Sequence, residues 1–232
     1  MKILAIETST LFGGVAIMDE SDGLIAEARL NVKTTHSERL MTVIHDALRQ
    51  SYLKISDIDV FGVSIGPGSF TGLRIGLSTA KGFSYATKKP IVSVPSLEAF
   101  AWNFPYSAYP VCPMFDARKK EIYAAVFRWK ENDFERVVDE ASFIPSALLE
   151  RLEGPVLFAG EGALLYQETI RRIAGENALF PPPHTMVPSP ANVAYLCLRK
   201  ALRRDFSEPL SLVPLYIRKS EAEVKMHSQN GM

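Results

Sequence analysis

The feature that most limits the fold is an order of predicted elements that occurs twice along the chain. In the first half, apolar runs at residues 2–8, 15–19 and 24–32 alternate with Gly-containing turns, a pattern typical of consecutive antiparallel strands. The spacing of apolar residues then becomes helical behind a capping box at residues 35–38. A strand at 60–65, a helix at 69–86 and a strand at 91–94 are predicted to follow.

The second half repeats this order. Strands are predicted at 111–116, 121–129 and 134–138, then a helix at 146–152, a strand at 156–159, a helix at 162–174, a weak strand at 185–188 and a helix at 191–204. Three antiparallel strands followed by a helix, a strand and a helix, present twice, predict two ribonuclease-H-like α/β domains side by side. We expect each domain to be a mixed sheet of about five strands flanked by helices, as in the actin, Hsp70 and sugar-kinase (ASKHA) superfamily. A single doubly wound α/β domain is the alternative.

The predicted domain boundary falls at a segment of turn formers and aromatic residues around position 104. We therefore assign residues 1–103 to the first domain and 104–206 to a second, more degenerate one. Residues 207–224 are expected to pack back on the first domain. The tail at 225–232 lacks periodicity and is expected to be disordered.

The charge balance excludes a protein that binds nucleic acid by itself. Among 232 residues, 26 Lys and Arg balance 26 Asp and Glu, whereas affinity for nucleic acid comes largely from basic side chains that neutralise phosphates. Cys112 and Cys197 lie in apolar runs and are expected to be buried, reduced thiols. The sequence has neither a signal-peptide pattern nor an apolar run long enough to cross a membrane, so we expect a cytoplasmic protein.

The most informative segment is GPGSFTGLRIG at residues 66–76, which follows a strand and opens a helix. Its spacing fits neither the Walker A phosphate loop nor the dinucleotide-binding Gly-x-Gly-x-x-Gly. Small residues recur every four positions and form what we call the glycine ridge: Gly68, Gly72, Gly76, Ala80 and Ser84. Such a ridge lets another backbone approach closely. Periodicity leaves open whether that backbone belongs to the chain's own sheet or to another protein.

The same segment, together with ILAIETST, HSERL and DARKKEIY, resembles the bacterial TsaB (YeaZ) family, and PLYIRKSEAE near the end resembles it more weakly. The resemblance implies a role in making N6-threonylcarbamoyladenosine (t6A) in tRNA. It also implies kinship with the threonylcarbamoyltransferase TsaD and joint work with TsaD and TsaE. Contact with tRNA would then be indirect, through the complex, and the chain alone could form a homodimer.

Kinship with TsaD provides a test for catalysis. TsaD-type sequences carry a metal-binding His-x-x-x-His after a related glycine segment, and the matching positions here are Ser96 and Phe100. Phe cannot bind a metal and Ser is a poor ligand, while the four histidines offer no pair spaced by four residues. We therefore expect no metal, no catalytic residue and a catalytically silent partner of TsaD.

Behind the capping box, apolar residues repeat at helical spacing and form an apolar stripe on the predicted helix. This stripe and the resemblance together suggest which residues contact that partner. The predicted interface consists of Leu40, Met41, Ile44, Leu48, Gly72, Leu73, Gly76 and Ala80.

Acidic and hydroxyl residues at the ends of two predicted strands suggest a nucleotide-proximal set: Glu7, Thr8, Ser9 and Asp116. The structural interpretation, which we favour, is that Glu7 caps a turn and Asp116 pairs with Arg118 or Lys119. No cofactor is expected on this chain alone, although ATP or ADP at the interface with TsaD is compatible with the resemblance. The competing function is an independent metallopeptidase-like or ATP-hydrolysing enzyme of the same superfamily.

Overall fold

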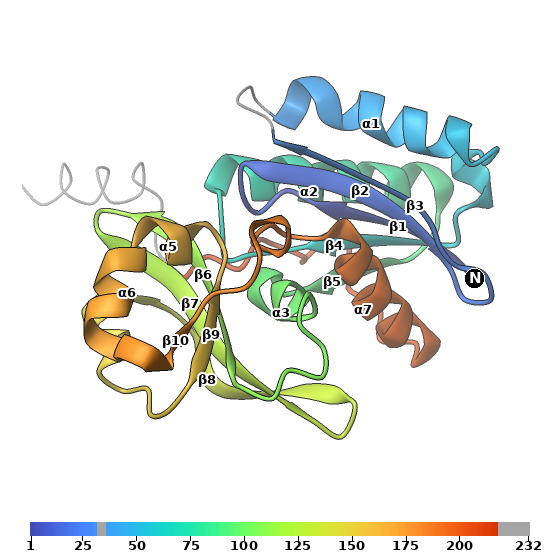
Figure 1. The fold of residues 1–232 in the computed structure, drawn as a ribbon. Helices are drawn as coiled ribbons and strands as arrows, with labels where there is room; N and C mark the ends of the chain where they lie inside the picture. Colours follow the sequence, from blue (N-terminus) through green and yellow to red (C-terminus); the bar gives the residue numbers. More distant parts are fainter. Residues whose placement is uncertain (32–35, 218–232) are drawn as a thin grey trace, which may run out of the picture.

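The protein contains two five-stranded mixed sheets, each flanked by helices (Figure 1). The computed structural model describes residues 1–31 and 36–217. The strand orders are β3-β2-β1-β4-β5 and β10-β9-β6-β7-β8, so the second sheet repeats the connectivity of the first. In both, three antiparallel strands are extended by two parallel ones. The predicted fold class of two ASKHA-like domains is confirmed, and a single doubly wound sheet is excluded.

The first sheet and its helices match the predicted positions closely. Its strands are β1 (Lys2–Glu7), β2 (Phe12–Asp19), β3 (Gly23–Asn31), β4 (Val60–Ser64) and β5 (Ile91–Val94), and its helices are α1 (His36–Gln50), α2 (Phe70–Thr87) and α3 (Ser96–Ala101), with a short 3-10 turn at Ile55–Asp57. Helix α3 was not predicted from the sequence. The capping box expected at 35–38 lies outside the side chains that the structure describes.

The second sheet agrees with prediction at its strands and differs near its far edge. It contains β6 (Val111–Arg118), β7 (Glu121–Lys130), β8 (Asp133–Phe143), β9 (Val156–Ala159) and β10 (Ala178–Leu179), with α4 (Pro145–Leu149), α5 (Glu161–Leu165), α6 (Gln167–Ala174) and α7 (Pro190–Leu202). The strand predicted at 185–188 is wrong, because the edge strand is β10 and the chain forms a 3-10 turn at Pro183–Thr185 instead. The helix predicted at 162–174 is divided at Tyr166 into α5 and α6.

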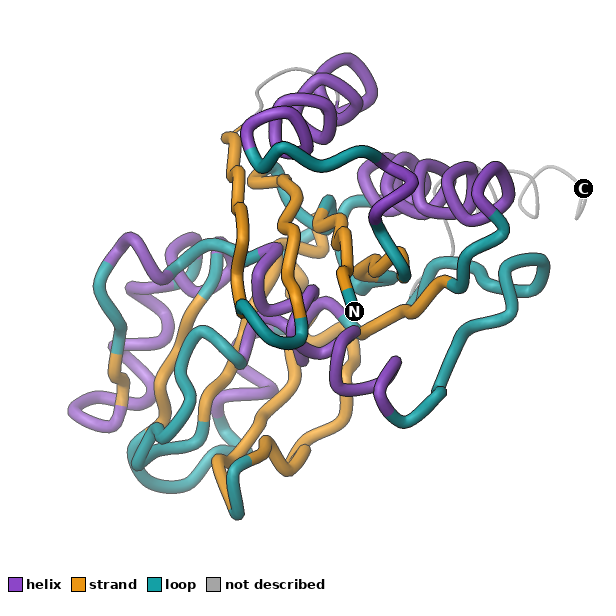
Figure 2. Tube along the Cα trace, turned by 90° about the vertical axis from the view of Figure 1, so that its right-hand side faces the viewer, coloured by secondary structure: helices purple, strands orange, loops and turns teal. Residues whose placement is uncertain are grey.

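Strand β1 has a buried residue at nearly every position because both faces of the first sheet are covered. On one face, Leu4 and Ile6 pack with α1 and α2, which lie side by side above the sheet (Figures 1 and 2). On the other face, Ile3 and Ala5 pack against α7. The alternation along β1 therefore separates two apolar cores.

The last helix of each half packs across the boundary on the sheet of the other half. Helix α3 buries Leu97 and Phe100 against β6 and β7, and the ring centroids of Phe100 and Phe115 are 5.5 Å apart. Helix α7 instead covers the first sheet, where Gly62 leaves room for Cys197. Both helices lie between the two sheets in Figure 1. The domain ranges 1–103 and 104–206 stay a prediction; each range contains the strands of one sheet, and α3 and α7 pack across the boundary between them.

Asn103 joins the segments that meet between the sheets. Its amide nitrogen donates to the carbonyls of Thr185 and Val187, at 3.1 and 2.9 Å. Its amide oxygen accepts a hydrogen bond of 2.7 Å from Asn192 on α7. A second connection starts from Glu27 on β3, whose carboxylate accepts from the Ser189 hydroxyl and the Ala191 N–H at the start of α7. The α7 N-terminus is therefore capped by a residue from the first sheet.

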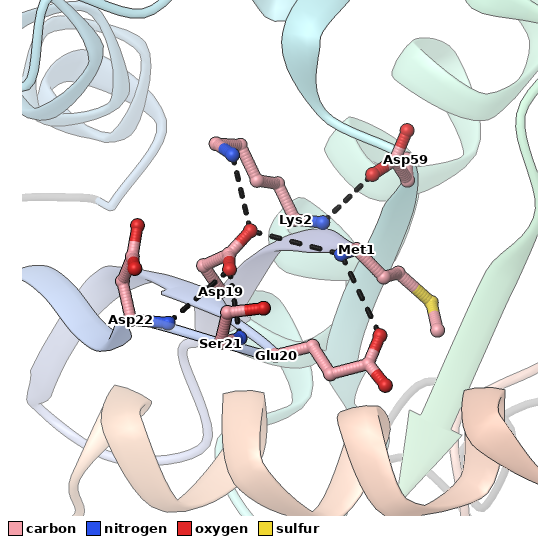
Figure 3. Close-up of polar contacts among 7 residues, drawn as sticks. All are labelled: Met1, Lys2, Asp19, Glu20, Ser21, Asp22 and Asp59. Atoms are coloured by element: carbon pink, nitrogen blue, oxygen red, sulfur yellow. Dashed lines mark hydrogen bonds and ion pairs between the residues drawn. The ribbon is translucent and has the colours of Figure 1, made fainter.

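The β2–β3 turn is held by the carboxylate of Asp19 (Figure 3). One oxygen accepts hydrogen bonds from the N–H groups of Ser21 and Asp22, and the other pairs with the Lys2 ammonium at 3.0 Å. The Ser21 N–H and Lys2 hold the pKa of Asp19 well below its usual range. This carboxylate therefore ties the turn to the first strand.

Residues 207–217, called the strap below, return to the first sheet. The N–H of Ser207 donates to the Ile91 carbonyl at 2.9 Å, and the N–H of Leu215 donates to the Ile65 carbonyl at 2.7 Å. The strap therefore runs from β5 to the glycine segment. The rest of the predicted 207–224 segment and the predicted tail at 225–232 lie outside the described residues. Within the residues that the structure describes, no helix is long and apolar enough to span a membrane.

Candidate functional site: the glycine segment and helix α2

The glycine segment packs against the β1–β2 turn of its own sheet. A Cβ atom on Gly68 would lie 2.2 Å from the carbonyl oxygen of Ser9, so only glycine fits at this position. The Ser9 carbonyl accepts a hydrogen bond of 2.6 Å from the Ser69 N–H. Helix α2 then begins with Ser69 as its N-cap, whose hydroxyl accepts from the Gly72 N–H. The bond between Ser69 and Ser9 fixes the start of α2 against the turn that follows β1, and the Ser69 cap begins the helix there.

Two turns further, Gly76 allows α2 to lie directly on Thr8. A Cβ atom at position 76 would lie 2.3 Å from the Thr8 hydroxyl oxygen. That hydroxyl donates a buried hydrogen bond of 2.8 Å to the Gly72 carbonyl. Of the two interpretations that periodicity left open, the ridge therefore serves close packing on the chain's own sheet.

Most residues of the predicted partner interface are buried within the chain. Leu40, Ile44 and Leu48 contribute to the core between α1 and the first sheet. On α2, the inward face contains Gly72, Leu73, Gly76 and Ala80. These seven residues face the chain's own sheet, and their contact with a partner stays a prediction. Met41 is the member that remains exposed, at 54%.

The opposite side of α2 faces solvent and defines what we call the outer face. Gly82 has no heavy atom within 4 Å of the position of a Cβ, so the helix surface is open there. Tyr85 is 78% exposed. The exposed residues of the outer face include Thr71, Arg74, Ser78, Gly82 and Tyr85.

The predicted nucleotide-proximal residues of the first domain lie inside the protein. Glu7 is 1% exposed, and its carboxylate accepts a hydrogen bond of 2.6 Å from the Ser9 N–H. Burial raises the pKa of Glu7, and this hydrogen bond opposes the shift. The Thr8 hydroxyl donates its hydrogen bond to the Gly72 carbonyl, as described above. The structural interpretation of Glu7 as a turn cap is confirmed.

Asp116 occupies the corresponding position at the end of β6. Its carboxylate accepts from the Arg118 N–H at 2.8 Å and pairs with the Arg118 guanidinium at 3.2 Å. The predicted pairing with Arg118 is confirmed. Next to it, burial raises the pKa of Glu161 at the start of α5; a hydrogen bond from the Asp116 backbone opposes this shift, and the Asp116 charge adds to it more weakly. The role of these residues near a nucleotide stays a prediction.

The two positions aligned with metal-binding histidines serve the fold. The Ser96 hydroxyl accepts a hydrogen bond of 3.0 Å from the Gly66 N–H, and Ser96 is 1% exposed. Phe100 belongs to the core around β6 and β7. Within residues 1–31 and 36–217, no three His, Cys, Asp or Glu side chains are grouped so that they could hold a metal ion. The thiols of Cys112 and Cys197 are buried, which raises the pKa of each to about 12.

Sequence reasoning missed the cluster of residues around Arg74. The Tyr216 ring from the strap stacks on Phe70, with centroids 5.0 Å apart, and its hydroxyl accepts a hydrogen bond from Arg74. The weak resemblance at PLYIRKSEAE was the available signal, because Tyr216 lies within that motif. The tertiary contact itself joins residues 142 positions apart and has no local pattern.

Comparison with known proteins places the chain in a family. Residues 25–226 match the family described as "TsaD: tRNA N6-adenosine threonylcarbamoyltransferase". The chain is 34% identical to the tRNA threonylcarbamoyladenosine biosynthesis protein TsaB of Bacillus subtilis (strain 168) over 228 residues, 97% of each chain. It is 32% identical over 157 residues to the TsaB of Escherichia coli (strain K12), with 66% of this chain and 67% of the other covered.

A solved structure supports the fold. YeaZ from Pseudomonas aeruginosa superimposes with a TM-score of 0.77 and 24% identity, covering 93% of this chain and 99% of the other. The identity and coverage of the Bacillus protein and the match over residues 25–226 agree with the motifs in the sequence. The chain is therefore a member of the TsaB (YeaZ) family of tRNA threonylcarbamoyladenosine biosynthesis proteins.

Proposed function

We propose that this chain is a non-catalytic partner of the TsaD threonylcarbamoyltransferase and acts with TsaD and TsaE in t6A biosynthesis. The observation that carries the proposal is the combination of a TsaD-like chain with two structural residues where TsaD-type proteins have metal ligands. Ser96 holds the backbone of Gly66, and Phe100 fills the core of the second sheet. Because both positions serve the fold, we propose that the chain contributes to the reaction by binding TsaD.

The outer face is the surface that we assign to TsaD. The inward sides of α1 and α2 are filled by the first sheet, so a partner meets only the outward sides. Ser78 and Gly82 lie one turn apart on α2, with no bulky side chain between the helix backbone and solvent at Gly82. Exposed Met41 and Tyr85 add apolar area at the edges. A helix of the partner lying along this face buries apolar surface at a close distance.

The decisive experiment reconstitutes t6A formation in vitro. Purified TsaD, TsaE, tRNA and the threonylcarbamoyl donor are assayed with and without this chain. We expect modification only when the chain is present. Equal t6A formation without it would contradict the proposal.

A matched pair of variants locates the interface. Gly82→Leu places a side chain on the outer face where space is open, so the chain should fold normally but lose co-purification with TsaD. Arg172→Leu likewise introduces an exposed leucine on a helix, at a position of α6 beside the other sheet, and should bind normally. Circular dichroism and thermal melting of both variants verify that the fold is kept. Normal binding by Gly82→Leu would exclude the outer face.

The competing function is an independent hydrolase, since a neighbouring structure is described as similar to a peptidase. That label belongs to the Pseudomonas protein, and its 24% identity transfers only the fold. Metal analysis and assays for ATP and peptide turnover on the purified chain test this alternative. Turnover that disappears in Glu7→Gln would favour it. The burial of Glu7 supports the opposite expectation, because substrate cannot reach a side chain that is 1% exposed.

A further inference from the structure

Arg74 is the residue of the outer face whose side chain is held most firmly. Its guanidinium lies over the Phe70 ring, with the central carbon 3.8 Å from the ring centroid. Its Nε donates a hydrogen bond of 2.7 Å to the hydroxyl of Tyr216. Tyr216 in turn stacks on Phe70. A long exposed side chain is thus fixed in one orientation by two aromatic residues, one of which comes from the strap.

Within residues 1–31 and 36–217, the contacts of Arg74 leave the two terminal nitrogens of its guanidinium without a hydrogen bond. Among these residues, only its Nε is engaged in a hydrogen bond and no acidic side chain pairs with the group. Arg74 itself is exposed. Phe70 and Tyr216 thereby reduce the entropy that Arg74 loses when it binds a ligand, because its rotamer is already fixed. The free pair of N–H groups has the planar geometry that binds a carboxylate or a phosphate through two parallel hydrogen bonds.

The surroundings of Arg74 favour a single carboxylate over a nucleic acid. Helix α2 contains only two basic residues, Arg74 and Lys81, and the chain has no net charge. Nucleic-acid binding at physiological salt requires several phosphate contacts, which one arginine does not supply. The position of Arg74 on the outer face also aligns it with Ser78 and Gly82, one and two turns further along the helix. A partner helix that covers those two residues extends to Arg74.

We propose that Arg74 forms a bidentate ion pair with an Asp or Glu carboxylate of the partner that binds the outer face, and that Phe70 and Tyr216 are positioning residues for this pair. The inference rests on the proposed function, because it names the partner's side of the same surface. It makes Arg74 the charge-selective contact of the outer face, whose other exposed residues named above are uncharged. It also makes the strap part of the binding surface, through the hydroxyl of Tyr216.

Binding measurements on four variants test the proposal against a purely structural role. The dissociation constant for purified TsaD is measured by biolayer interferometry at about 50 mM and about 500 mM NaCl. Arg74→Ala should weaken binding by at least about tenfold at the lower salt concentration, and Arg74→Glu by more, since it faces a like charge. Arg74→Lys should lose several-fold because an ammonium lacks the planar fork. Tyr216→Phe should raise the dissociation rate by about two- to fivefold and keep the association rate.

Thermal melting separates this role from fastening of the strap. If Arg74 only holds Tyr216, then Arg74→Ala and Arg74→Glu should weaken the fold equally and affect TsaD binding equally. If instead Arg74→Glu weakens TsaD binding more than Arg74→Ala does, and this extra loss of affinity becomes smaller at high salt, then the partner carries a negative charge at this contact. The strongest support would be restoration of Arg74→Glu binding by one Asp→Arg or Glu→Arg change on TsaD, found by scanning its exposed acidic residues.

The failures of the two proposals are distinguishable. If the wild-type chain does not bind TsaD, the proposed function falls, and this inference falls with it. If the wild-type chain binds but Arg74→Glu binds within about twofold of it, the proposed function stands and the ion pair is wrong. If Arg74→Glu leaves TsaD binding unchanged but lowers retention of tRNA by the assembled complex, Arg74 contacts phosphate, which also overturns the inference.

Discussion

Two glycines of the same helix should respond to alanine in opposite ways. Gly76 faces Thr8, the residue that follows β1, and Gly82 lies six residues further along α2 on the solvent side. Both are helical, so both substitutions gain about 1 kcal/mol from the higher helix propensity of alanine. For Gly82→Ala nothing opposes this gain, because no heavy atom lies within 4 Å of the new methyl group. Its free energy of unfolding should rise by up to about 1 kcal/mol.

Gly76→Ala places the methyl group 2.3 Å from the Thr8 hydroxyl oxygen. Thr8 must shift, which costs about 1–3 kcal/mol in a packed core. The shift also weakens the buried hydrogen bond from Thr8 to the Gly72 carbonyl, worth about 0.5–1.5 kcal/mol. After subtraction of the propensity gain, the free energy of unfolding should fall by about 0.5–3.5 kcal/mol. At about 2–4 °C per kcal/mol, the melting temperature should fall by roughly 1–14 °C.

Urea titration of the wild type and both single variants measures these changes. A double variant isolates the cause, because Thr8→Ala removes the clashing oxygen and leaves the next atoms at 3.4 and 3.5 Å from the new methyl group. The cost of Gly76→Ala should therefore be much smaller in the Thr8→Ala background than in the wild type. If Gly76→Ala were as stable as Gly82→Ala, the close packing of α2 on β1 would be refuted.

Three other side chains, Glu27, Asn103 and Glu140, give further predictions that can be tested independently. Glu27→Gln removes the charge that caps α7, so the free energy of unfolding should fall by about 1 kcal/mol in a urea titration. Asn103→Ala deletes three hydrogen bonds and should cost about 2–3 kcal/mol, read as a lower melting temperature. Burial raises the pKa of Glu140 to about 7, so the folded chain holds this proton more tightly than the unfolded chain, and stability should decline as the pH rises from about 4.5 through about 7. Glu140→Gln should flatten that decline in melting curves.

Most strands could be predicted from the sequence, because short apolar runs bounded by Gly-containing turns are typical of strands and rarely occur in helices. Helices α1 and α2 could be predicted because each has a clear helical period. Helix α3 was missed because it has only six residues and no side-chain cap. Strand β10 was missed because two residues carry no periodicity, and their pairing with β9 is a tertiary event.

The candidate site was harder to predict for a physical reason. A stripe of small or apolar residues has the same spacing whether it faces the chain's own sheet or another protein, so periodicity could not identify the outer face. Ser78 and Gly82 lie beyond the motif at residues 66–76, and although Arg74 lies within that motif, the motif does not show that its side chain is exposed. The stack of Phe70, Arg74 and Tyr216 depends on the path of the strap, which no local pattern reveals.

The exchange of α3 and α7 between the two sheets bears on how the chain is made and on how it can move. In a fragment that ends at Asn103, the face of the first sheet that α7 covers would be exposed. The same fragment would contain α3 without the second sheet on which it packs. Each half alone should therefore aggregate, and the halves should regain solubility only when they are produced together. Opening the two sheets like a clamshell would pull both helices from apolar cores, so the two sheets should move as one rigid body.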